Sequence, residues 1–589
     1  MMMEYLAAHP LRVRSVVQFP PIADRMAWEA VDPADRADLL ALAEKWRGEP
    51  WPLLTAGMYA SFCRTGSRKD CETPYFNRRV KLIAAALHVC LTGETTDLPI
   101  VEDGLWLLCE ETTWAISAHA ELSAEHPFPD AQRTIIDLFA AQTGMILSFI
   151  CQLLEDVLHP DLYGRVRSEV ERRILRPFMT YDGEWWMGFV RKDLCNWTPW
   201  IVSNVMMAAN VWEYDCAALY PRACAMLDRW LACVPEDGGC DEGAGYWNMA
   251  AGAFLDCLML LEQTADVRLW DIAKVQRMMA YPELMHLGGG WFANFADCDA
   301  RPYLSGERLQ YAGLKTGNAA LVCMGVEMRG LPSREVSDVP HLSRVLMQLF
   351  AETVPTVKLK RETKDVWLPD LQVRIVGRPD MTVAMKGGHN GESHNHNDVG
   401  SFLVMAQGDM QIVDAGNMVY TAKTFSDRRY ELWNCRSIYH NVPVIAGVEQ
   451  GVGAQYAARD VECLPDGMRL DIAGAYPAEA CVKRCLRDMR LQSGVLTICD
   501  EILLTEEKPV VWVFMLRQKP IIIPGGYLLD GGDGRIRLTW GETAVLAADV
   551  EEICVTDARM AKSYPGSLWR LTLSTDARRE HRAEFRIGS

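Results

Sequence analysis

The stretch GGHNGESHNHNDVGSF, residues 387–402, is the densest polar segment of the chain and holds three of its 12 histidines. Side chains alternate along a β-strand, so a strand here would place His394 and His396 on one face. Two imidazoles on one face, with a carboxylate and a third imidazole nearby, are typical of a divalent-metal site. Asp414, expected at the end of a neighbouring strand, and His440 are the candidates to complete it.

The sequence around this stretch has the pattern of β-strands. Short alternating or β-branched runs, separated by Gly-rich turns, predict strands. The runs are 372–376, 381–385, 402–405, 410–413, 510–516, 536–540 and 568–573. Many short strands with such turns indicate an antiparallel β-sandwich.

Roughly the first 350 residues carry the pattern of amphipathic helices instead. Apolar residues recur at steps of three and four between 135 and 154, which predicts one buried helical stripe. Similar periodicity occurs at 35–46, 77–91, 202–213, 218–233, 250–264 and 340–351. Such helices with short joints fit a bundle, a solenoid or a closed toroid, and periodicity does not choose among them. The order predicts a multidomain α+β chain, with a helical domain at 1–352 and a β domain at 353–589.

Length, charge and cysteine content narrow the class of protein. A chain of 589 residues exceeds what one hydrophobic core usually supports. A net charge of -18 excludes binding to nucleic acid or to an anionic membrane through bulk charge.

No apolar run approaches the ~18 residues that span a bilayer, and no apolar signal-peptide core follows the N-terminus. The 19 cysteines lie in core-like segments and predict free, buried thiols. We therefore expect a cytoplasmic protein. The chain could also form a homo-oligomer, which the sequence does not decide.

The segment 389–402 resembles the signature of the heparinase II/III-like polysaccharide lyases, and so do 420–430 and 437–443. The resemblance is strongest over about 387–445. It implies an N-terminal (α/α) toroid followed by a C-terminal antiparallel β-sandwich, which agrees with the order of helices and strands. It also implies β-elimination in glycosaminoglycan-like substrates that contain uronic acid.

Weaker stretches of the helical half, 109–114, 195–200 and 241–248, also resemble the family. The resemblance implies that Asn196 neutralises the carboxylate of the uronate. It also implies that Tyr246 and His394 transfer the protons, one as the base and the other as the acid, without indicating which is which. The residue types suit this chemistry. The C5 proton lies next to a carboxylate and is weakly acidic, so a neutral amide that spreads the enediolate charge helps its removal. A tyrosine or histidine can then take that proton and return one to the leaving oxygen.

Further residues are expected to hold the acidic oligo- or polysaccharide substrate, through aromatic stacking, a positive charge or polar contacts. They are Glu110, Trp197, Trp247, Asn395, Tyr420 and Arg429. The resemblance also implies that His396, Asp414 and His440 hold a structural Zn²⁺, which would fix the strand that carries His394.

Three other functions remain open. Two histidines and a carboxylate also ligate iron in non-haem oxygenases, a function that leaves Asn196 and Tyr246 unexplained. A non-catalytic glycan-binding protein on this scaffold would be expected to lack the base or the neutralising amide. A glycoside hydrolase needs two carboxylates at a defined separation, for which Glu110, Glu111, Asp241 and Glu242 are available. A cytoplasmic location favours short oligosaccharides, and the overall acidity favours weakly sulfated ones.

Overall fold

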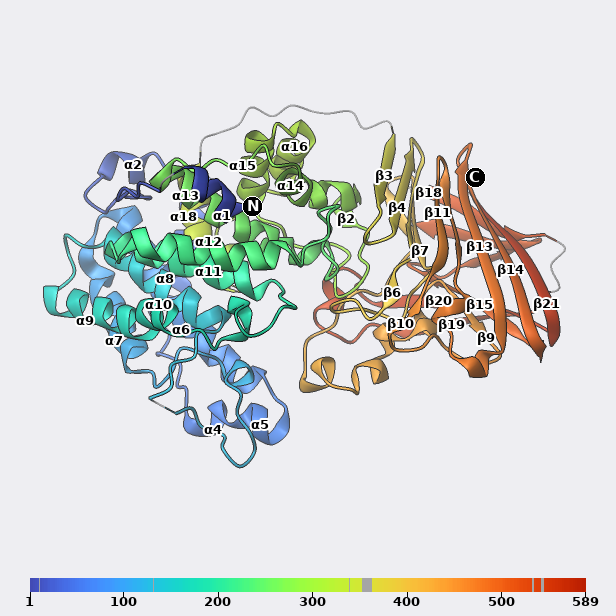
Figure 1. The fold of residues 1–589 in the computed structure, drawn as a ribbon, viewed down its shortest axis with the longest axis horizontal. Coiled ribbons are helices and arrows are strands. Elements are labelled where there is room, and N and C mark those ends of the chain that lie inside the picture. The colour runs from blue at the N-terminus through green and yellow to red at the C-terminus, as the bar shows by residue number, and fades with distance from the viewer. Residues whose placement is uncertain are drawn as a thin grey trace. The chain divides into compact units, whose positions relative to one another are not determined.

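The computed structural model describes residues 1–9, 11–130, 132–337, 339–351, 363–531, 534–541 and 545–588 (Figure 1). The chain divides into a helical unit, Met1–Val234, Asn248–Met279 and Ser305–Val357, and a β unit, Pro235–Trp247, Ala280–Leu304 and Lys358–Ser589. The predicted boundary at 352/353 lies outside the described residues. Two short segments of the first 352 residues, 235–247 and 280–304, group with the β unit, which the change of sequence pattern did not indicate.

The helices of the first unit follow the predicted periodic segments, and α14 (Ala273–Met285) runs on into the β unit. The others are α1 (Met2–Ala8), α2 (Arg25–Glu29), α3 (Pro33–Arg47), α4 (Ala56–Tyr59), α5 (Ser61–Thr65), α6 (Lys69–Thr92), α7 (Leu98–Glu110), α8 (Leu138–Leu153), α9 (Pro160–Val170), α10 (Arg176–Thr180), α11 (Trp197–Trp212), α12 (Cys216–Leu231), α13 (Ala251–Ala265), α15 (Gly306–Thr316), α16 (Ala319–Met328), α17 (Arg334–Ser337) and α18 (Leu342–Phe350).

Helix α8 shows how the sequence produces these elements. Asp137 precedes the helix, and its carboxylate accepts a hydrogen bond from the backbone N–H of Ala140 at 2.7 Å. The predicted apolar stripe is buried from Met145 to Leu154, including Phe149 and Ile150, whereas its first residues at 135, 138 and 139 are partly exposed. Burial of each such side chain contributes roughly 1.5–3 kcal/mol. Packing of this stripe, more than helix propensity, therefore holds α8 in place.

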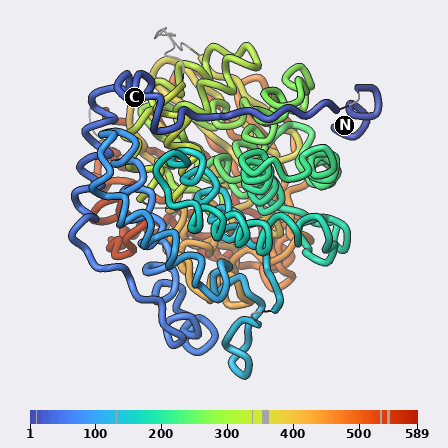
Figure 2. Tube along the Cα trace, turned by 90° about the vertical axis from the view of Figure 1, so that its left-hand side faces the viewer, coloured from blue at the N-terminus to red at the C-terminus, as the bar shows by residue number. Residues whose placement is uncertain are grey.

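The extended segment 11–22 crosses the C-terminal ends of three helices (Figure 2). The N–H of Arg14 donates to the carbonyl of Thr264 in α13, and that of Ile22 donates to the carbonyl of Leu153 in α8. Asn210 of α11 donates its amide to the carbonyl of Val16 at 2.9 Å. The first two bonds use helix-end carbonyls that have no partner within their own helices. Among the described residues, no helix is long and apolar enough to cross a membrane.

Within the described residues, the β unit contains one nine-stranded and one eight-stranded antiparallel sheet. The first has the order β19-β20-β15-β8-β7-β5-β4-β3, with β9 paired to β15, and the second has the order β11-β12-β13-β14-β21-β18-β17-β16. The strands of the first sheet are β3 (Lys364–Leu368), β4 (Val373–Arg378), β5 (Met381–Lys386), β7 (Phe402–Ala406), β8 (Asp409–Ile412), β9 (Pro443–Ile445), β15 (Val510–Leu516), β19 (Val545–Cys554) and β20 (Ser567–Thr575). The strands of the second are β11 (Arg459–Leu464), β12 (Gly467–Asp471), β13 (Val482–Gln492), β14 (Val495–Lys508), β16 (Ile521–Ile523), β17 (Gly526–Gly531), β18 (Gly534–Trp540) and β21 (Arg578–Gly588).

One apolar core joins the two sheets, because residues of both alternate inward along their strands. The pairs β1 (His286–Gly288) with β2 (Trp291–Phe292), and β6 (His389–Asn390) with β10 (Gly453–Ala457), stand apart from them. The hairpin β13–β14 turns through Ser493 and Gly494, both at positive φ, as a two-residue turn of this kind requires. The predicted order of helices first and antiparallel strands second is therefore confirmed.

The first sheet positions the polar stretch 387–402. Strands β5 and β7 pair antiparallel, and the stretch is mainly the excursion between them. Strand β7 begins where its neighbour β8 ends, so the residues before β7 and after β8 meet at one end of the sheet. Strand β9, which follows His440, pairs with β15 beside them. This arrangement gathers segments that are up to about 50 residues apart in sequence.

Candidate active site and metal cluster

Tyr246 and His394 meet inside the β unit. Tyr246 lies in the 3₁₀ turn Ala244–Asn248, and its hydroxyl is 3.4 Å from Nδ1 of His394. Residues 391–400 form turns, not the predicted strand, and His394 adopts φ 56°. The prediction that His394 and His396 share a strand face is therefore wrong. A left-handed backbone at a non-glycine residue costs about 1–2 kcal/mol, which the surrounding contacts must offset.

Asp297 supplies the contacts that hold His394. One carboxylate oxygen is 2.8 Å from Nδ1 of His394, and the other is 3.1 Å from Nε2 of His396 and 2.8 Å from Nη2 of Arg429. Burial alone would raise the pKa of Asp297, but the hydrogen bonds from both histidines, with the charge of Arg429, hold it well below its usual range. The carboxylate is thus ionised and accepts, so Nδ1 of His394 carries a proton. Among the described residues, Nε2 of His394 has no hydrogen-bond partner.

Two glycines let neighbouring loops approach the segment that carries Asp297. Gly243 has φ 95°, and a Cβ there would lie 2.8 Å from the carbonyl oxygen of Phe295. Gly416 has φ 67°, and its Cβ would lie 2.5 Å from the carbonyl oxygen of Cys298. Only glycine tolerates both the dihedral and the contact. The loops before Tyr246 and after β8 can therefore pack on the 295–298 segment.

Tyr420 and Asn417 extend the hydrogen-bond network. The hydroxyl of Tyr420 is 2.5 Å from that of Tyr246 and 3.0 Å from Nδ2 of Asn417. Asn417 also donates Nδ2–H to the backbone carbonyl of Asp297 at 3.1 Å. Burial raises the pKa of Tyr246 and of Tyr420 well above the usual value of 10. Both hydroxyls are therefore protonated at neutral pH.

Glu242 is a second buried carboxyl group near the two proton carriers. Its side chain is 4% exposed, and Oε2 has no hydrogen-bond partner among the described residues. Burial raises the pKa of Glu242 to about 7, although the nearby His394 opposes the shift. This carboxyl group therefore changes charge near neutral pH.

His396, Asp414 and His440 lie together, as predicted for a metal site. One ligand atom from each lies within 4.8 Å of the others, and all three side chains are fully buried. Nδ1 of His440 is 2.7 Å from the Asp414 carboxylate. Among the described residues, Nδ1 of His396 and Nε2 of His440 have no hydrogen-bond partner. Buried ring nitrogens without partners beside a carboxylate are a donor set that suits Zn²⁺.

Three predicted substrate contacts are corrected by the structure. Trp247 is 1% exposed, so its ring packs in the protein interior and cannot stack on a sugar. Asn395 is buried, donates to the carbonyl of His396, and accepts from the hydroxyl of Tyr430 at 2.6 Å. Arg429 is buried and donates to Asp297 and to the backbone carbonyls of residues 394, 395 and 424. Asn395 and Arg429 thus hold the loop together, because their polar atoms are already engaged.

Asn196, Trp197 and Glu110 belong to the helical unit. Asn196 is at the N-cap position of α11, is buried, and makes no capping hydrogen bond with its side chain. Trp197 packs against His119 and Trp185, with ring centroids 4.6 and 5.0 Å away. Glu110 pairs with an arginine of α9 and lines a cavity of about 480 Å³. Their roles stay predictions.

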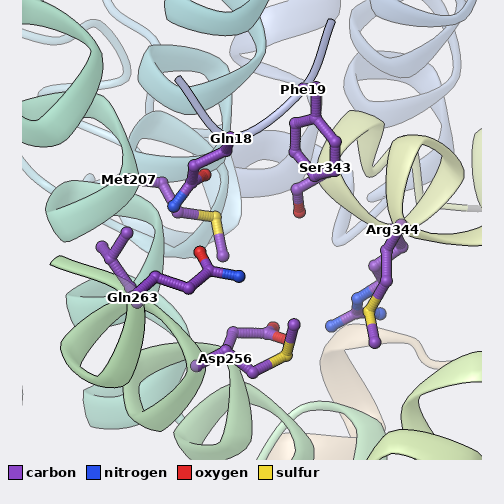
Figure 3. Close-up of a pocket in the computed structure, with 10 residues that line it drawn as sticks. Gln18, Phe19, Met207, Asp256, Gln263, Ser343 and Arg344 are labelled. Atoms are coloured by element: carbon purple, nitrogen blue, oxygen red, sulfur yellow. The ribbon is translucent and has the colours of Figure 1, made fainter. Parts of the chain in front are cut away.

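A smaller cavity of about 70 Å³ lies within the helical unit (Figure 3). Gln18 and Phe19 of the crossing segment line it, together with residues of α11, α13 and α18. Its charged lining residues are Asp256 and Arg344, and Asp256 is bound through both carboxylate oxygens to Arg308, at 3.1 and 2.8 Å. The cavity contains none of the predicted site residues, so it does not compete with the cluster around Tyr246 as the candidate site.

The sequence predictions missed Asp297, Asn417 and the position of Glu242. Asp297 is 97 residues from His394, with which it pairs. Its segment, Asn294-Phe295-Ala296-Asp297-Cys298-Asp299, mixes amide and carboxylate groups with apolar residues. That mixture is the one local signal that could have drawn attention to it.

Residues 362–580 match the family described as Heparinase II/III-like, C-terminal. A solved heparinase III has TM-score 0.66 and 11% identity, over 100% of this chain and 89% of that chain. Heparan sulfate lyase HepC from Pedobacter heparinus has TM-score 0.57 and 12% identity, over 100% and 87%. A Streptomyces coelicolor A3 chondroitin AC lyase in complex with chondroitin sulphate has TM-score 0.50 and 12% identity, over 96% and 82%. A comparison with curated protein sequences finds no match. The shared fold confirms the predicted class, an (α/α) toroid followed by an antiparallel β-sandwich.

Proposed function

Because residues 362–580 belong to the heparinase II/III-like family, we propose that this chain is a polysaccharide lyase that cleaves uronic-acid-containing glycans by β-elimination. The observation that carries the proposal is the pairing of a hydroxyl with an imidazole whose tautomer is fixed. Tyr246 and His394 are 3.4 Å apart, and Asp297 accepts the Nδ1 proton of His394. One group that accepts a proton and one that donates a proton are what an elimination needs.

The fixed tautomer suggests how the roles are divided. His394 presents the lone pair of Nε2 and takes the C5 proton of the uronate. The C5–H electrons form the C4–C5 double bond as the bond between C4 and its oxygen breaks. Tyr246 keeps its proton at neutral pH because burial raises its pKa, and it gives that proton to the departing oxygen. The products are an unsaturated uronate end and a new free hydroxyl.

Asn196 is assigned the role of binding and neutralising the carboxylate of the uronate. A neutral amide that donates to this carboxylate spreads the charge of the enediolate, which lowers the barrier to removal of the C5 proton. The role requires an amide that is not used to cap a helix. Asn196 is at the start of α11, yet its side chain makes no capping hydrogen bond.

His396, Asp414 and His440 are assigned a structural Zn²⁺. The unpartnered ring nitrogens and the adjacent carboxylate are ligands that this ion prefers. All three side chains are fully buried, whereas an iron oxygenase needs an open coordination position for its substrate. The ion would supply fixed positive charge that orders the loop carrying His394.

We expect a preference for short, weakly sulfated oligosaccharides. The net charge of -18 repels a dense polyanion at long range. Arg429, the predicted cationic contact, is occupied inside the protein. Initial rates on size-fractionated chondroitin, hyaluronan and heparan oligosaccharides measure this preference, and a marked preference for long, highly sulfated chains would contradict it.

The lyase proposal is tested by the ultraviolet absorbance of the conjugated double bond, followed with a panel of uronate glycans. We expect a rise with the wild-type protein and its loss in Tyr246→Phe and His394→Ala. Tyr527→Phe and His126→Ala are matched controls outside the site and should keep the wild-type rate. No rise with any uronate glycan, from folded wild-type protein, would reject the proposal.

A further inference from the structure

The orientation of the Asn417 side-chain amide is fixed by two backbone groups. Its Oδ1 accepts from the backbone N–H of Met418 at 2.8 Å, and its Nδ2 faces the backbone carbonyl of Asp297 at 3.1 Å. A backbone N–H can only donate and a carbonyl can only accept, so the oxygen and nitrogen of the amide cannot be exchanged. Asn417 is 2% exposed, so water does not compete for these bonds. The second Nδ2 proton therefore points at the hydroxyl oxygen of Tyr420, 3.0 Å away.

The Tyr420 oxygen accepts from Asn417, so its own proton must be donated elsewhere. Among the described residues, two further atoms are within reach: the Tyr246 hydroxyl at 2.5 Å and Nδ1 of His394 at 3.5 Å. Nδ1 already carries the proton that it donates to Asp297 and has no lone pair to offer. The acceptor that remains is the hydroxyl oxygen of Tyr246.

We infer that Asn417 and Tyr420 form a one-way hydrogen-bond relay that turns the proton of Tyr246 toward the substrate. Tyr246 accepts from Tyr420, and its second neighbour, Nδ1 of His394, is protonated. Within the described cluster its proton therefore has no acceptor and is free for the leaving oxygen. When Tyr246 gives up that proton, the hydrogen bond from Tyr420 stabilises the phenolate. Tyr420 is thus a positioning residue, and its contact with the sugar ring stays a prediction.

This inference rests on the proposed lyase function and concerns the step that protonates the leaving oxygen. The charged and titratable groups around the two hydroxyls are Glu242, Asp297, His394 and Arg559, which is itself paired with Asp299. None of these groups takes the place of the Tyr420 hydrogen bond to Tyr246. Loss of that bond should therefore leave substrate binding intact and weaken Tyr246 as an acid.

The test compares Tyr420→Phe with Tyr527→Phe on two kinds of substrate. For Tyr420→Phe we expect kcat on a natural glycan to fall roughly 10–100-fold, about 1.4–2.8 kcal/mol in the barrier. KM should change little, because the phenyl ring is kept and only the hydroxyl is lost. On a uronate with fluoride at C4, whose departure needs no proton, the variant should recover most of the wild-type rate. Tyr527 is in β17, outside the relay and outside the His394 loop, so Tyr527→Phe should behave as wild type on both substrates.

The outcomes separate the relay from the lyase function. An active wild type, with Tyr420→Phe keeping the wild-type kcat on the glycan, would overturn the relay alone. An equal loss of rate on the glycan and on the fluoride, or a rise in KM alone, would also overturn it. A wild type that eliminates neither substrate would reject the lyase function itself. A thermal melt of Tyr420→Phe identifies misfolding. If part of the variant is misfolded, the elimination rate of the folded fraction on the C4 fluoride, compared with its rate on the glycan, still tests the relay.

Discussion

Asp297 is the residue whose replacement should damage both the site and the fold. Its buried carboxylate, 1% exposed, accepts from His394, His396 and Arg429. In Asp297→Ala the buried guanidinium of Arg429 loses its counter-charge, which costs about 3–5 kcal/mol of unfolding free energy. In Asp297→Asn the volume is kept, but a neutral amide offers one oxygen where the carboxylate offered two. We expect a loss at the lower end of that range, about 3 kcal/mol, because one oxygen still accepts a hydrogen bond but Arg429 loses its counter-charge here too.

The catalytic effect of Asp297→Asn should exceed its effect on stability. Without the carboxylate, His394 is no longer held with its proton on Nδ1, and the Nε2 lone pair is lost in part of the population. In the serine-protease triad, the same exchange of an aspartate behind a histidine costs about 10⁴ in kcat. Here we expect kcat to fall about 10²–10⁴-fold with a folded protein.

Absorbance kinetics and urea unfolding check these expectations together. Asp488→Asn is the matched control: this carboxylate also pairs with two arginines, Arg469 and Arg490, but is in β13 and partly exposed. It should cost at most about 1 kcal/mol and leave kcat unchanged. An Asp297→Asn protein with wild-type kcat would show that Asp297 does not set the tautomer of His394.

Three further changes test other parts of the structure. Asp414→Asn, or dialysis against a chelator, should lower the zinc content measured by emission spectrometry and also the melting temperature; native protein that never contains metal would remove the zinc proposal. Glu242→Gln should stabilise the protein at pH 8 but not below pH 4.5, because the carboxyl pKa is raised from 4.5 to about 7 in the fold. The folded wild-type protein binds this proton more tightly than the unfolded chain does. Its free energy of unfolding therefore falls by about 3 kcal/mol in total as pH rises from 4.5 to 7. Equal urea midpoints for the wild type and Glu242→Gln at pH 8 would contradict this. Trp247→Ala should cost about 3–5 kcal/mol of unfolding free energy, because the buried ring leaves a cavity, and a rise in KM at unchanged stability would restore its predicted stacking role.

The sequence by itself determined the class of fold and indicated the residues of the candidate metal cluster. Periodicity between 135 and 154 predicted α8, and the run 510–516 predicted β15, because burial of one face imposes the period of each element. His396, Asp414 and His440 could be selected from the polar stretch and the family resemblance, and they come together because they flank β7, β8 and β9 of one sheet. Local pattern carries such information, since it reflects local geometry.

Only the tertiary structure decided how the proton-transfer groups are oriented. Asp297 reaches His394 across 97 residues, and Tyr246 reaches Tyr420 across 174. Nothing in their own segments encodes those partners, because the partners are set by the packing of loops made possible by Gly243 and Gly416. The same packing places Trp247 in the interior and turns Arg429 inward, against the sequence prediction for both. Residue types thus indicate which chemistry is available, while the direction of each hydrogen bond depends on distant backbone groups that only the folded chain brings together.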